Sequence, residues 1–475
     1  MSSQGEVVTQ RDLERLRQLV KDGALVHPLD KSRGSFVDLV NAVSLCCGAE
    51  ETANGLGGSA KCFFDDIGGT AKRHIVLVLC DGMGTAALEE HLPEGSFLRE
   101  HNQPDRLTAV FPSTTPAALT SLATGVFPGQ HGFPGWDLRD QAECDFPGGE
   151  VGPGVVHLRV LHPHVEDMRS GGAPVAEKGF PPSWKNAPEG GDPLFVAQPW
   201  TRRMAIQRRL HFVNAYNQTD FSDWTQGEFA DPEKDCLTVI PETAYETLGT
   251  PEGSAKALEY FAEGVAAALE RIRAAEAAGE KTYTYLYTAH PDKHMHSLGV
   301  SHPEVRAVIR GLNEQIQKFS DELRATLDAT VVVTADHGHV TVPPRCMVSL
   351  PPALLDCLEY ANIGVVGPGR HAVFHCRPGL EGEFERLWGE SAQLSEKFLL
   401  LKTDDAAREG LFGPEGRVHL KVRPRLGHFL ALSVDQSTLV KPSEAALRDG
   451  PEPACKGAHG SLTPVEMRIP FVLLK

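Results

Sequence analysis

The sequence VVVTADHGHV, residues 331–340, joins a run typical of a buried strand to a cluster of titratable side chains. Its opening valines are β-branched and apolar, the composition of a strand that is covered on both faces of a sheet. Asp336, His337 and His339 follow directly, where burying a charged group is costly unless a partner compensates it. Alone, this pattern indicates a polar loop that caps a strand, but it is not the only such stretch in the chain.

Three further segments place a polar residue shortly after an apolar run of strand length. They are HIVLVLC (74–80) with Asp81, RLTAVF (106–111) with Thr115, and TYTYLYT (282–288) with Asp292. Thr115 precedes Pro116, the N-cap and first-turn arrangement that begins a helix. Amphipathic helices are predicted over 254–273 and 301–327, the second opened by a capping box of Ser301 and Glu304. Strands that alternate with helices predict a mostly parallel α/β sheet covered on both faces.

The carboxyl ends of parallel strands meet at one edge of a sheet, which is where ligands bind in open α/β folds. We therefore expect Asp81, Thr115, Asp292 and the Asp336-His337 pair to converge. Three neighbouring aspartates without a counter-charge repel one another and are driven toward protonation. Divalent cations at this edge would resolve the repulsion.

Histidines near these aspartates make the metal hypothesis more specific. His296 stands four residues after Asp292 in HPDKHMH, and His459 stands in KGAHGSLT near the end of the chain. Together with His337 they give a mixed carboxylate and imidazole donor set. Such a set suits zinc or a similar first-row ion better than calcium or magnesium.

In this order, Asp81-Gly82, FPSTTPAALTSLATG, PDKHMH, ADHG and HGSLTPVEM resemble the alkaline phosphatase superfamily. Within it the chain most resembles the type I phosphodiesterase/nucleotide pyrophosphatase branch, over about 73–345 and 456–471. The resemblance implies a three-layer α/β/α sandwich with a mostly parallel central sheet and a small α/β insert. It also implies metal-dependent hydrolysis of phosphodiester or pyrophosphate bonds in small nucleotide-like substrates.

Carried over residue by residue, the resemblance implies two divalent ions, expected to be Zn²⁺. One would be held by Asp292, His296 and His459. The other would be held by Asp81, Asp336 and His337. Thr115 would contact both ions and act as the nucleophile, through a phosphothreonine intermediate, with Thr114 as the fallback.

Two positions depart from the pattern of the branch. Ala118 stands where an Asn usually binds a phosphate oxygen, three residues after the nucleophile. Met295 stands where a Gly usually precedes the metal-binding His296, so His294 remains a competing ligand. The other imidazoles near the motifs are expected to support the ligands or to lie at the surface; they are His339, His371 and His428.

Composition limits the remaining possibilities. The net charge of −17 over 475 residues argues against binding nucleic acid polymers, whose affinity depends on neutralised phosphates. No run approaches the roughly 18 apolar residues needed to cross a bilayer, and the first residues are polar rather than signal-like. The ten cysteines are scattered without CxxC spacing, so no disulfide framework is indicated. A cytoplasmic protein that acts on a small phosphate ester, with no membrane partner, is the expectation.

The predicted organisation has three parts. Residues 1–73 are a lead-in that packs on the core, residues 74–345 and 425–475 form the metal-binding catalytic core, and residues 346–424 form the small α/β insert. Within the core, residues 148–253 are interpreted as long Gly- and Pro-rich connections. Alternative functions are a phosphonate hydrolase or a phosphomonoesterase on the same two-metal site, or an inactive relative that binds a metal or nucleotide.

Overall fold

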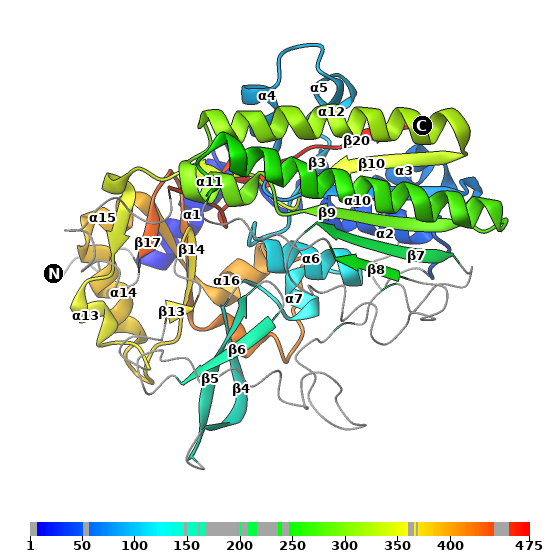
Figure 1. Ribbon diagram of the computed structural model, residues 1–475. Coiled ribbons are helices and arrows are strands. Elements are labelled where there is room, and N and C mark those ends of the chain that lie inside the picture. The colour runs from blue at the N-terminus through cyan, green and yellow to red at the C-terminus, as the bar shows by residue number, and fades with distance from the viewer. Residues whose placement is uncertain are drawn as a thin grey trace.

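The computed structural model describes residues 7–50, 57–135, 137–146, 150–159, 162–167, 197, 200, 208–215, 236–239, 247–359, 365–366, 369–440 and 456–475. Its central sheet has the strand order β20-β10-β2-β9-β7-β8 (Figure 1). The strands are β2 (His74–Cys80), β7 (Arg209–Ala215), β8 (Cys236–Val239), β9 (Thr282–Thr288), β10 (Ala329–Thr334) and β20 (Val472–Leu474). Neighbours from β10 to β8 pair in parallel, and β20 pairs antiparallel with β10. The apolar runs predicted as β2, β9 and β10 are buried along their whole length, so the fold is mixed α/β around them.

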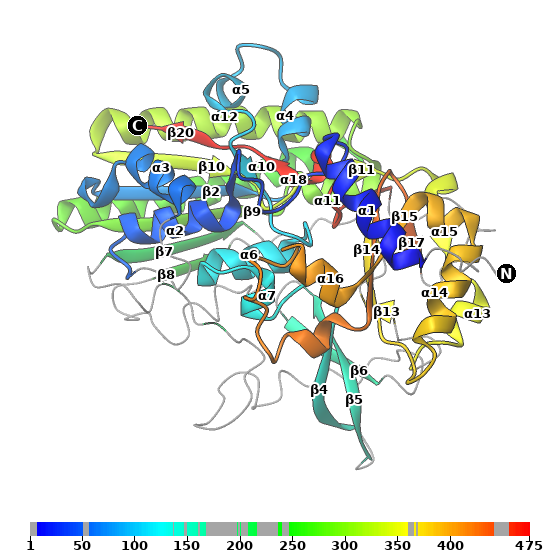
Figure 2. The same cartoon turned by 180° about the vertical axis from the view of Figure 1, so that it is seen from behind.

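Helices lie on both sides of this sheet. α10 (Pro251–Ala277) packs against β7 and β9, and α12 (Pro303–Thr326) packs against β10. They lie in front of the sheet in Figure 1, whereas α2 (Phe36–Cys46) and α3 (Gly58–Ile67) lie on its other side, facing the viewer in Figure 2. α12 begins at Pro303, where the side chain of His302 accepts a hydrogen bond from Glu304 N. The predicted capping box of Ser301 and Glu304 is therefore wrong, because the imidazole next along the chain takes the capping position.

The run at residues 106–111 does not join the central sheet. Only β3 (Leu107–Thr108) is strand, and it pairs with β1 (Gly34–Ser35) and β19 (Arg468–Ile469) in a separate three-stranded sheet. The apolar residues after it are buried in the core without a continued ladder, and Ala109 N donates to Met467 O. The prediction of a fourth parallel strand of the central sheet here was wrong. An apolar run of this length is also compatible with a buried extended segment that pairs with no strand of that sheet.

The Gly- and Pro-rich segment 148–253 contains strands that the sequence analysis missed. Within it, β5 (Glu150–Arg159) and β6 (His162–Asp167) form an antiparallel sheet with β4 (Asp137–Phe146), which precedes the segment. β7 and β8 extend the central sheet, with β7 paired to β9 from Arg209↔Thr282 to Ala215↔Thr288. The interpretation of this segment as connections alone is therefore wrong.

A second sheet, antiparallel throughout, has the order β13-β14-β16-β15. It is built from β13 (Val365–Val366), β14 (His371–Phe374), β15 (Phe398–Lys402) and β16 (Phe429–Ser433), with α14 (Glu381–Glu390) and α15 (Ala392–Lys397). Its own apolar cluster includes Phe374, Phe384 and Trp388. α1 (Val8–Lys21) packs against β15 and α14, and Asp12 accepts a hydrogen bond from Leu400 N. The N-terminal helix thus lies on this second sheet, while the domain boundaries stay a prediction.

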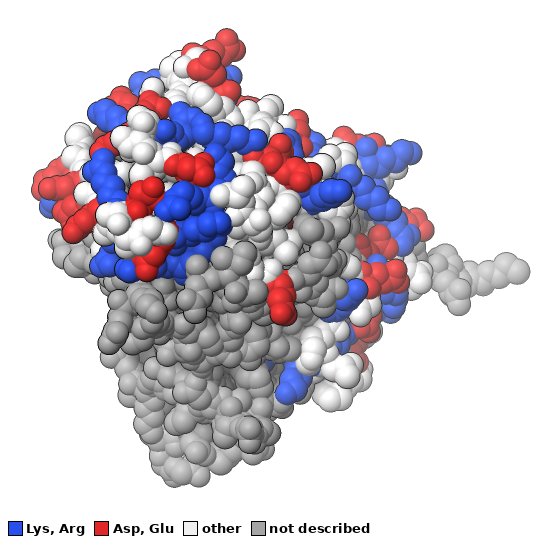
Figure 3. All heavy atoms as spheres, turned by 90° about the vertical axis from the view of Figure 1, so that its right-hand side faces the viewer, with Lys and Arg blue, Asp and Glu red and all other residues white. Residues whose placement is uncertain are grey.

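The surface carries charges of both signs. Figure 3 shows Lys and Arg side chains beside Asp and Glu side chains on one face. Ion pairs among the described residues include Lys72–Asp328 and Arg73–Glu276, each with an N–O distance of 2.8 Å. Across the described ranges, no helix is both long and apolar enough to cross a membrane.

Candidate functional site

The carboxyl ends of β2, β9 and β10 bring three aspartates together. Asp81 follows β2, Asp292 begins α11 (Asp292–Leu298) after β9, and Asp336 follows β10. Asp292 N donates to Asp81 O at 3.0 Å, and Gly82 N donates to Asp336 Oδ1 at 3.1 Å. Gly82 has a φ of 71°, and a Cβ there would lie 2.8 Å from the Asp292 Cβ, so only glycine permits this close approach.

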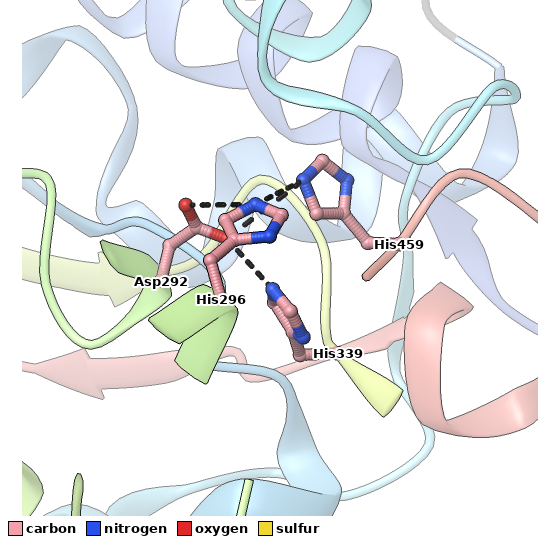
Figure 4. A group of neighbouring side chains, drawn as sticks. All are labelled: Asp292, His296, His339 and His459. Atoms are coloured by element: carbon pink, nitrogen blue, oxygen red, sulfur yellow. Dashed lines mark hydrogen bonds and ion pairs between the residues drawn. The ribbon is translucent and has the colours of Figure 1, made fainter. Parts of the chain in front are cut away.

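A first group consists of Asp292, His296, His339 and His459 (Figure 4). One ligand atom from each residue lies within 4.8 Å of those of the other three. His296 is one turn after Asp292 on α11, with its Nε2 3.4 Å from Asp292 Oδ2. His339 and His459 place their Nε2 atoms 3.2 and 3.8 Å from Asp292 Oδ1. Three imidazoles thus surround one buried carboxylate.

Backbone carbonyls fix which nitrogen of two of these rings carries the proton. His296 Nδ1 donates to Gly457 O at 2.9 Å, and His459 Nδ1 donates to Ser113 O at 2.8 Å. In the neutral rings each Nε2 therefore presents a lone pair, and these two atoms lie only 3.2 Å apart. Two facing lone pairs are stabilised by a cation between them, and a backbone bond to the far nitrogen is the usual support for a metal-binding imidazole. The donor set fits a first-row divalent ion.

A second group consists of Asp81, Asp292 and His337, again with ligand atoms within 4.8 Å of one another. His337 Nδ1 donates to Gly338 O at 3.0 Å, which leaves Nε2 facing Asp81 Oδ1 at 3.5 Å. Tyr287 donates its hydroxyl proton to the other oxygen, Asp81 Oδ2, at 2.5 Å. Asp292 belongs to both groups, so its carboxylate lies between them.

Asp336 lies beside the second group. Its Oδ1 accepts hydrogen bonds from Gly82 N and His337 N, whereas its Oδ2 is buried, accepts no hydrogen bond and lies 3.4 Å from His337 Nε2. A buried carboxylate oxygen in this condition is costly unless a cation or proton compensates it. This geometry suits a metal ligand whose second oxygen is held by backbone.

Thr115 is the first residue of α6 (Thr115–Thr124), and its side chain faces the second group. Its Oγ1 lies 3.1 Å from His337 Nε2 and 3.5 Å from Asp81 Oδ1. The Oγ1 of the preceding residue, Thr114, is buried without a hydrogen-bond partner. Thr115 rather than Thr114 thus contacts the candidate metal ligands. Ala118, one turn into α6, is fully buried.

Burial and charge shift the titration of these carboxyl groups in different directions. Burial, with the neighbouring charges of Asp336 and Asp292, raises the pKa of Asp81 well above its usual value. Burial also raises the pKa of Asp336. For Asp292, burial acts upward as well, but the imidazoles of His296, His339 and His459 hold the pKa well below its usual value. A cation beside Asp81 and Asp336 would favour the ionised forms of both acids.

The remaining histidines of the motifs lie elsewhere. His294 points its Nδ1 to His290 Nδ1 at 2.9 Å and belongs to neither group. His371 packs edge-on to Phe111, and His428 Nδ1 accepts from Cys376 N at 3.0 Å. His339 is not at the surface but is buried within the first group, where its role as supporting residue or ligand stays a prediction.

One buried ion pair braces the loops that carry the candidate ligands. Arg370 binds both carboxylate oxygens of Glu466 at 2.7 Å. Glu466 Oε1 also accepts from Ser461 N at 3.0 Å, two residues after His459, and Glu466 O accepts from Gly338 N at 2.8 Å. A single acidic residue therefore ties both loops to the second sheet.

Comparisons with solved structures identify proteins of similar fold. The structure resembles murine ectonucleotide pyrophosphatase/phosphodiesterase 5, with 17% identity over 84% of this chain and 87% of that chain and a TM-score of 0.50. It also resembles the phosphonoacetate hydrolase of Sinorhizobium meliloti in complex with phosphonoformate, with 17% identity, coverage of 85% and 90% and a TM-score of 0.57. A search of curated protein sequences found no match. The likeness to these structures establishes an alkaline phosphatase-like fold.

The family assignment comes from the sequence itself. Residues 75–462, which carry every candidate ligand and Thr115, match the family described as type I phosphodiesterase/nucleotide pyrophosphatase. The chain belongs to the type I phosphodiesterase/nucleotide pyrophosphatase family.

Proposed function

We propose that this protein is a metal-dependent hydrolase that cleaves phosphodiester or pyrophosphate bonds in small nucleotide-like substrates. The observation that carries the proposal is the position of Thr115 Oγ1, 3.1 Å from His337 Nε2 and 3.5 Å from Asp81 Oδ1. A hydroxyl placed among candidate metal ligands at the carboxyl edge of a parallel sheet is a suitable nucleophile for phosphorus. The family match supports the same conclusion.

Two divalent ions, zinc by their donor set, would occupy the site. Asp292, His296 and His459 would hold one, and Asp81, Asp336 and His337 would hold the other, with Thr115 beside both. When bound, such ions lower the pKa of a coordinated hydroxyl and neutralise charge on a phosphoryl group.

Thr115 would attack the phosphorus of the substrate while its hydroxyl proton passes to a water molecule, and the leaving oxygen would take up a proton from water. A bond forms between Oγ1 and phosphorus, the bond from phosphorus to the leaving oxygen breaks, and water later hydrolyses the phosphothreonine. Tyr287 holds Asp81 in place by its hydrogen bond to Oδ2, and the Gly338 carbonyl holds the His337 ring. The role of these residues is to orient the reacting hydroxyl before substrate arrives.

A specific feature of the site keeps a phosphonate hydrolase as the second candidate. Ala118 is apolar and fully buried where the diesterase branch usually provides an Asn to the phosphate. The fold likeness to a phosphonoacetate hydrolase accommodates the same candidate. A phosphomonoesterase on the same two-metal site is the other alternative.

A substrate panel tests the proposal. Zinc-loaded protein is assayed on the nitrophenyl ester of a nucleotide, on nitrophenyl phosphate and on phosphonoacetate, with metal content measured in the same samples. A preference for the nucleotide ester supports the proposal. A preference for phosphonoacetate or for nitrophenyl phosphate replaces it with the corresponding alternative, and inactivity of metal-loaded protein on all three favours a binding role.

A further inference from the structure

His339 is the one member of the first group that the three-residue metal assignment leaves out. It lies three residues after Asp336, immediately before β11 (Val340–Thr341), and its side chain is fully buried. Its Nδ1 has no hydrogen-bond partner, and the one polar neighbour of its Nε2 is Asp292 Oδ1 at 3.2 Å. Burying an imidazole with so few polar contacts is costly, and a cation at Nε2 would offset part of that cost.

Strand pairing places His339 opposite His459. β11 pairs antiparallel with β18 (Gly457–Ala458) in the register Val340↔Ala458 and Thr341↔Gly457. Continuing this register by one residue sets His339 across from His459. The two ring centroids are 5.3 Å apart, and the His339 ring lies edge-on to His296 at 4.5 Å (Figure 4).

The surrounding backbone leaves room for this ring and for little else. A Cβ on Gly457 would lie 2.7 Å from His339 Cε1 and 2.4 Å from Met295 O. The absence of a side chain at Gly457 thus allows His339 to reach the group. In that position its Nε2 lies 3.2 Å from Asp292 Oδ1, on the carboxylate that His296 and His459 also approach.

We propose that His339 Nε2 is a fourth protein ligand of the ion held by Asp292, His296 and His459. This inference rests on the proposed metal site and adds one donor to it, giving one carboxylate and three imidazoles. A zinc site with three protein ligands keeps an open position, and a fourth protein ligand either closes it or raises the coordination number. Adding imidazole also favours zinc and its late first-row neighbours over manganese or magnesium.

The alternative role for His339 is to donate a hydrogen bond to Asp292 without touching the ion. The two roles differ in a distance that can be measured directly. In crystals of the zinc-loaded protein, with zinc located by anomalous scattering, a ligand places His339 Nε2 about 2.0–2.1 Å from the ion. A separation above about 3 Å, the range of a hydrogen-bonded neighbour, overturns the proposal.

Metal retention provides a second test that does not depend on activity. Wild type, His339→Asn and His101→Asn are loaded with zinc and dialysed against increasing concentrations of a zinc chelator, and zinc per chain is measured by elemental analysis. His101 lies in α5 (Phe97–His101), which packs against α12 and β20. It belongs to neither candidate metal group, so its variant is the matched control. Losing a residue that only supports a ligand weakens metal affinity by about 10–100-fold, so losing a ligand should weaken retention of one ion at least tenfold.

The outcomes separate this inference from the function on which it rests. Loss of one zinc from His339→Asn at a chelator concentration at least tenfold lower than for both other proteins, together with a zinc-to-Nε2 distance of about 2.0–2.1 Å in the wild-type crystals, supports the proposal. Equal retention in all three proteins overturns it but leaves the two-metal hydrolase intact. If wild-type protein binds no zinc at all, both the fourth ligand and the proposed function fail. Should His339→Asn not fold, the zinc-to-nitrogen distance in wild-type crystals decides alone.

Discussion

His296 Nε2 lies 3.2 Å from His459 Nε2, although the other nitrogen of each ring donates to a backbone carbonyl. The helix that carries His296 and the loop that carries His459 are distant in the sequence, and this contact joins them. Because both atoms present lone pairs in the neutral rings, the contact is repulsive until a cation or an additional proton occupies it.

Zinc should therefore stabilise the folded chain. At a free zinc concentration 100 times its Kd, one site adds about 2.7 kcal/mol to the free energy of unfolding. Thermal unfolding of chelated and zinc-loaded protein measures the effect as a rise in Tm. His459→Ala should lose the part of this rise that its own site contributes, whereas His101→Asn should keep the whole rise. A Tm that zinc leaves unchanged in the wild-type protein would contradict the metal assignment.

Thr115→Ala should abolish turnover while the protein keeps its metal. Removal of a nucleophile costs several orders of magnitude in kcat, so we expect a loss of at least about 1,000-fold. Steady-state kinetics and elemental analysis on the same preparation check both halves of the prediction. Trapping of labelled substrate on wild-type protein at low pH should place the covalent group on Thr115.

Thr114→Val is the matched control for the nucleophile, because Thr114 Oγ1 makes no hydrogen bond that the substitution would remove. Its activity should stay within a few-fold of wild type. If Thr114→Val is inactive and Thr115→Ala is not, the attacking hydroxyl belongs to Thr114.

Tyr287→Phe should weaken binding of the ion beside Asp81. The variant removes the hydroxyl that donates to Asp81 Oδ2 at 2.5 Å and keeps the ring. Loss of a group that orients a metal ligand typically costs about 10–100-fold in affinity. Zinc competition titration should show one weakened site and one unchanged site; two unchanged sites would mean that Asp81 does not bind metal.

Arg370→Met should strongly destabilise the protein. The substitution leaves the Glu466 carboxylate buried without its cation, and breaking such a pair costs about 3–5 kcal/mol. Adding Glu466→Gln should recover much of the loss, because Gln can still accept from Ser461 N without carrying a charge. Urea unfolding of the single and double variants measures both, and a single variant within about 1 kcal/mol of wild type would refute the bracing role.

Acid should destabilise the protein through a histidine outside the site. Burial lowers the pKa of His131 to about 3, and this ring lies 3.0 Å from Ser121 Oγ through Nε2. The unfolded chain, with a pKa near 6.5, then binds more protons than the folded chain between pH 6.5 and 3. The contribution of neutral His131 to the free energy of unfolding is fully present above pH 6.5 and is lost as the pH falls from 6.5 toward 3.

The contribution of His131 can be isolated by comparing slopes. His131→Gln should reduce the loss of unfolding free energy by up to about 1.4 kcal/mol per pH unit between pH 6 and 4. Chelator in both samples removes the effect of metal release. Parallel curves for wild type and variant would show that His131 does not titrate on unfolding.

Much of the central sheet was predictable because the local sequence of three of its strands is typical of a buried strand. Continuous apolar runs in β2, β9 and β10 match strands covered on both faces, and each ends at a polar residue. The sequence RLHFVNA of β7 contains apolar residues but was not predicted as a strand. It lies in a segment rich in glycine and proline, which is typical of loops. The opposite error occurred at 106–111, where an apolar run forms only a two-residue strand outside the central sheet.

Within the candidate site, residues fixed by short spacing were easier to predict than those fixed by distant pairing. His296 follows Asp292 by one helical turn, so the sequence alone indicates that the two side chains share a face. The position of His339 depends on the pairing of β11 with β18, more than a hundred residues further along the chain. The only local signal was its place in DHGH beside two predicted ligands.

The pairing of Thr341 with Gly457 also separates the segments that carry the candidate ligands from the segment that forms the second sheet. The chain leaves the first group after His339 and rejoins it at His459, at paired positions of β11 and β18. All strands of the second sheet lie between these positions in the sequence. Related proteins could carry a longer, shorter or different segment here without displacing His339 or His459, provided that the ion pair of Arg370 and Glu466 is kept. The segment between these two positions could thus change in length or sequence while the two imidazoles keep their places.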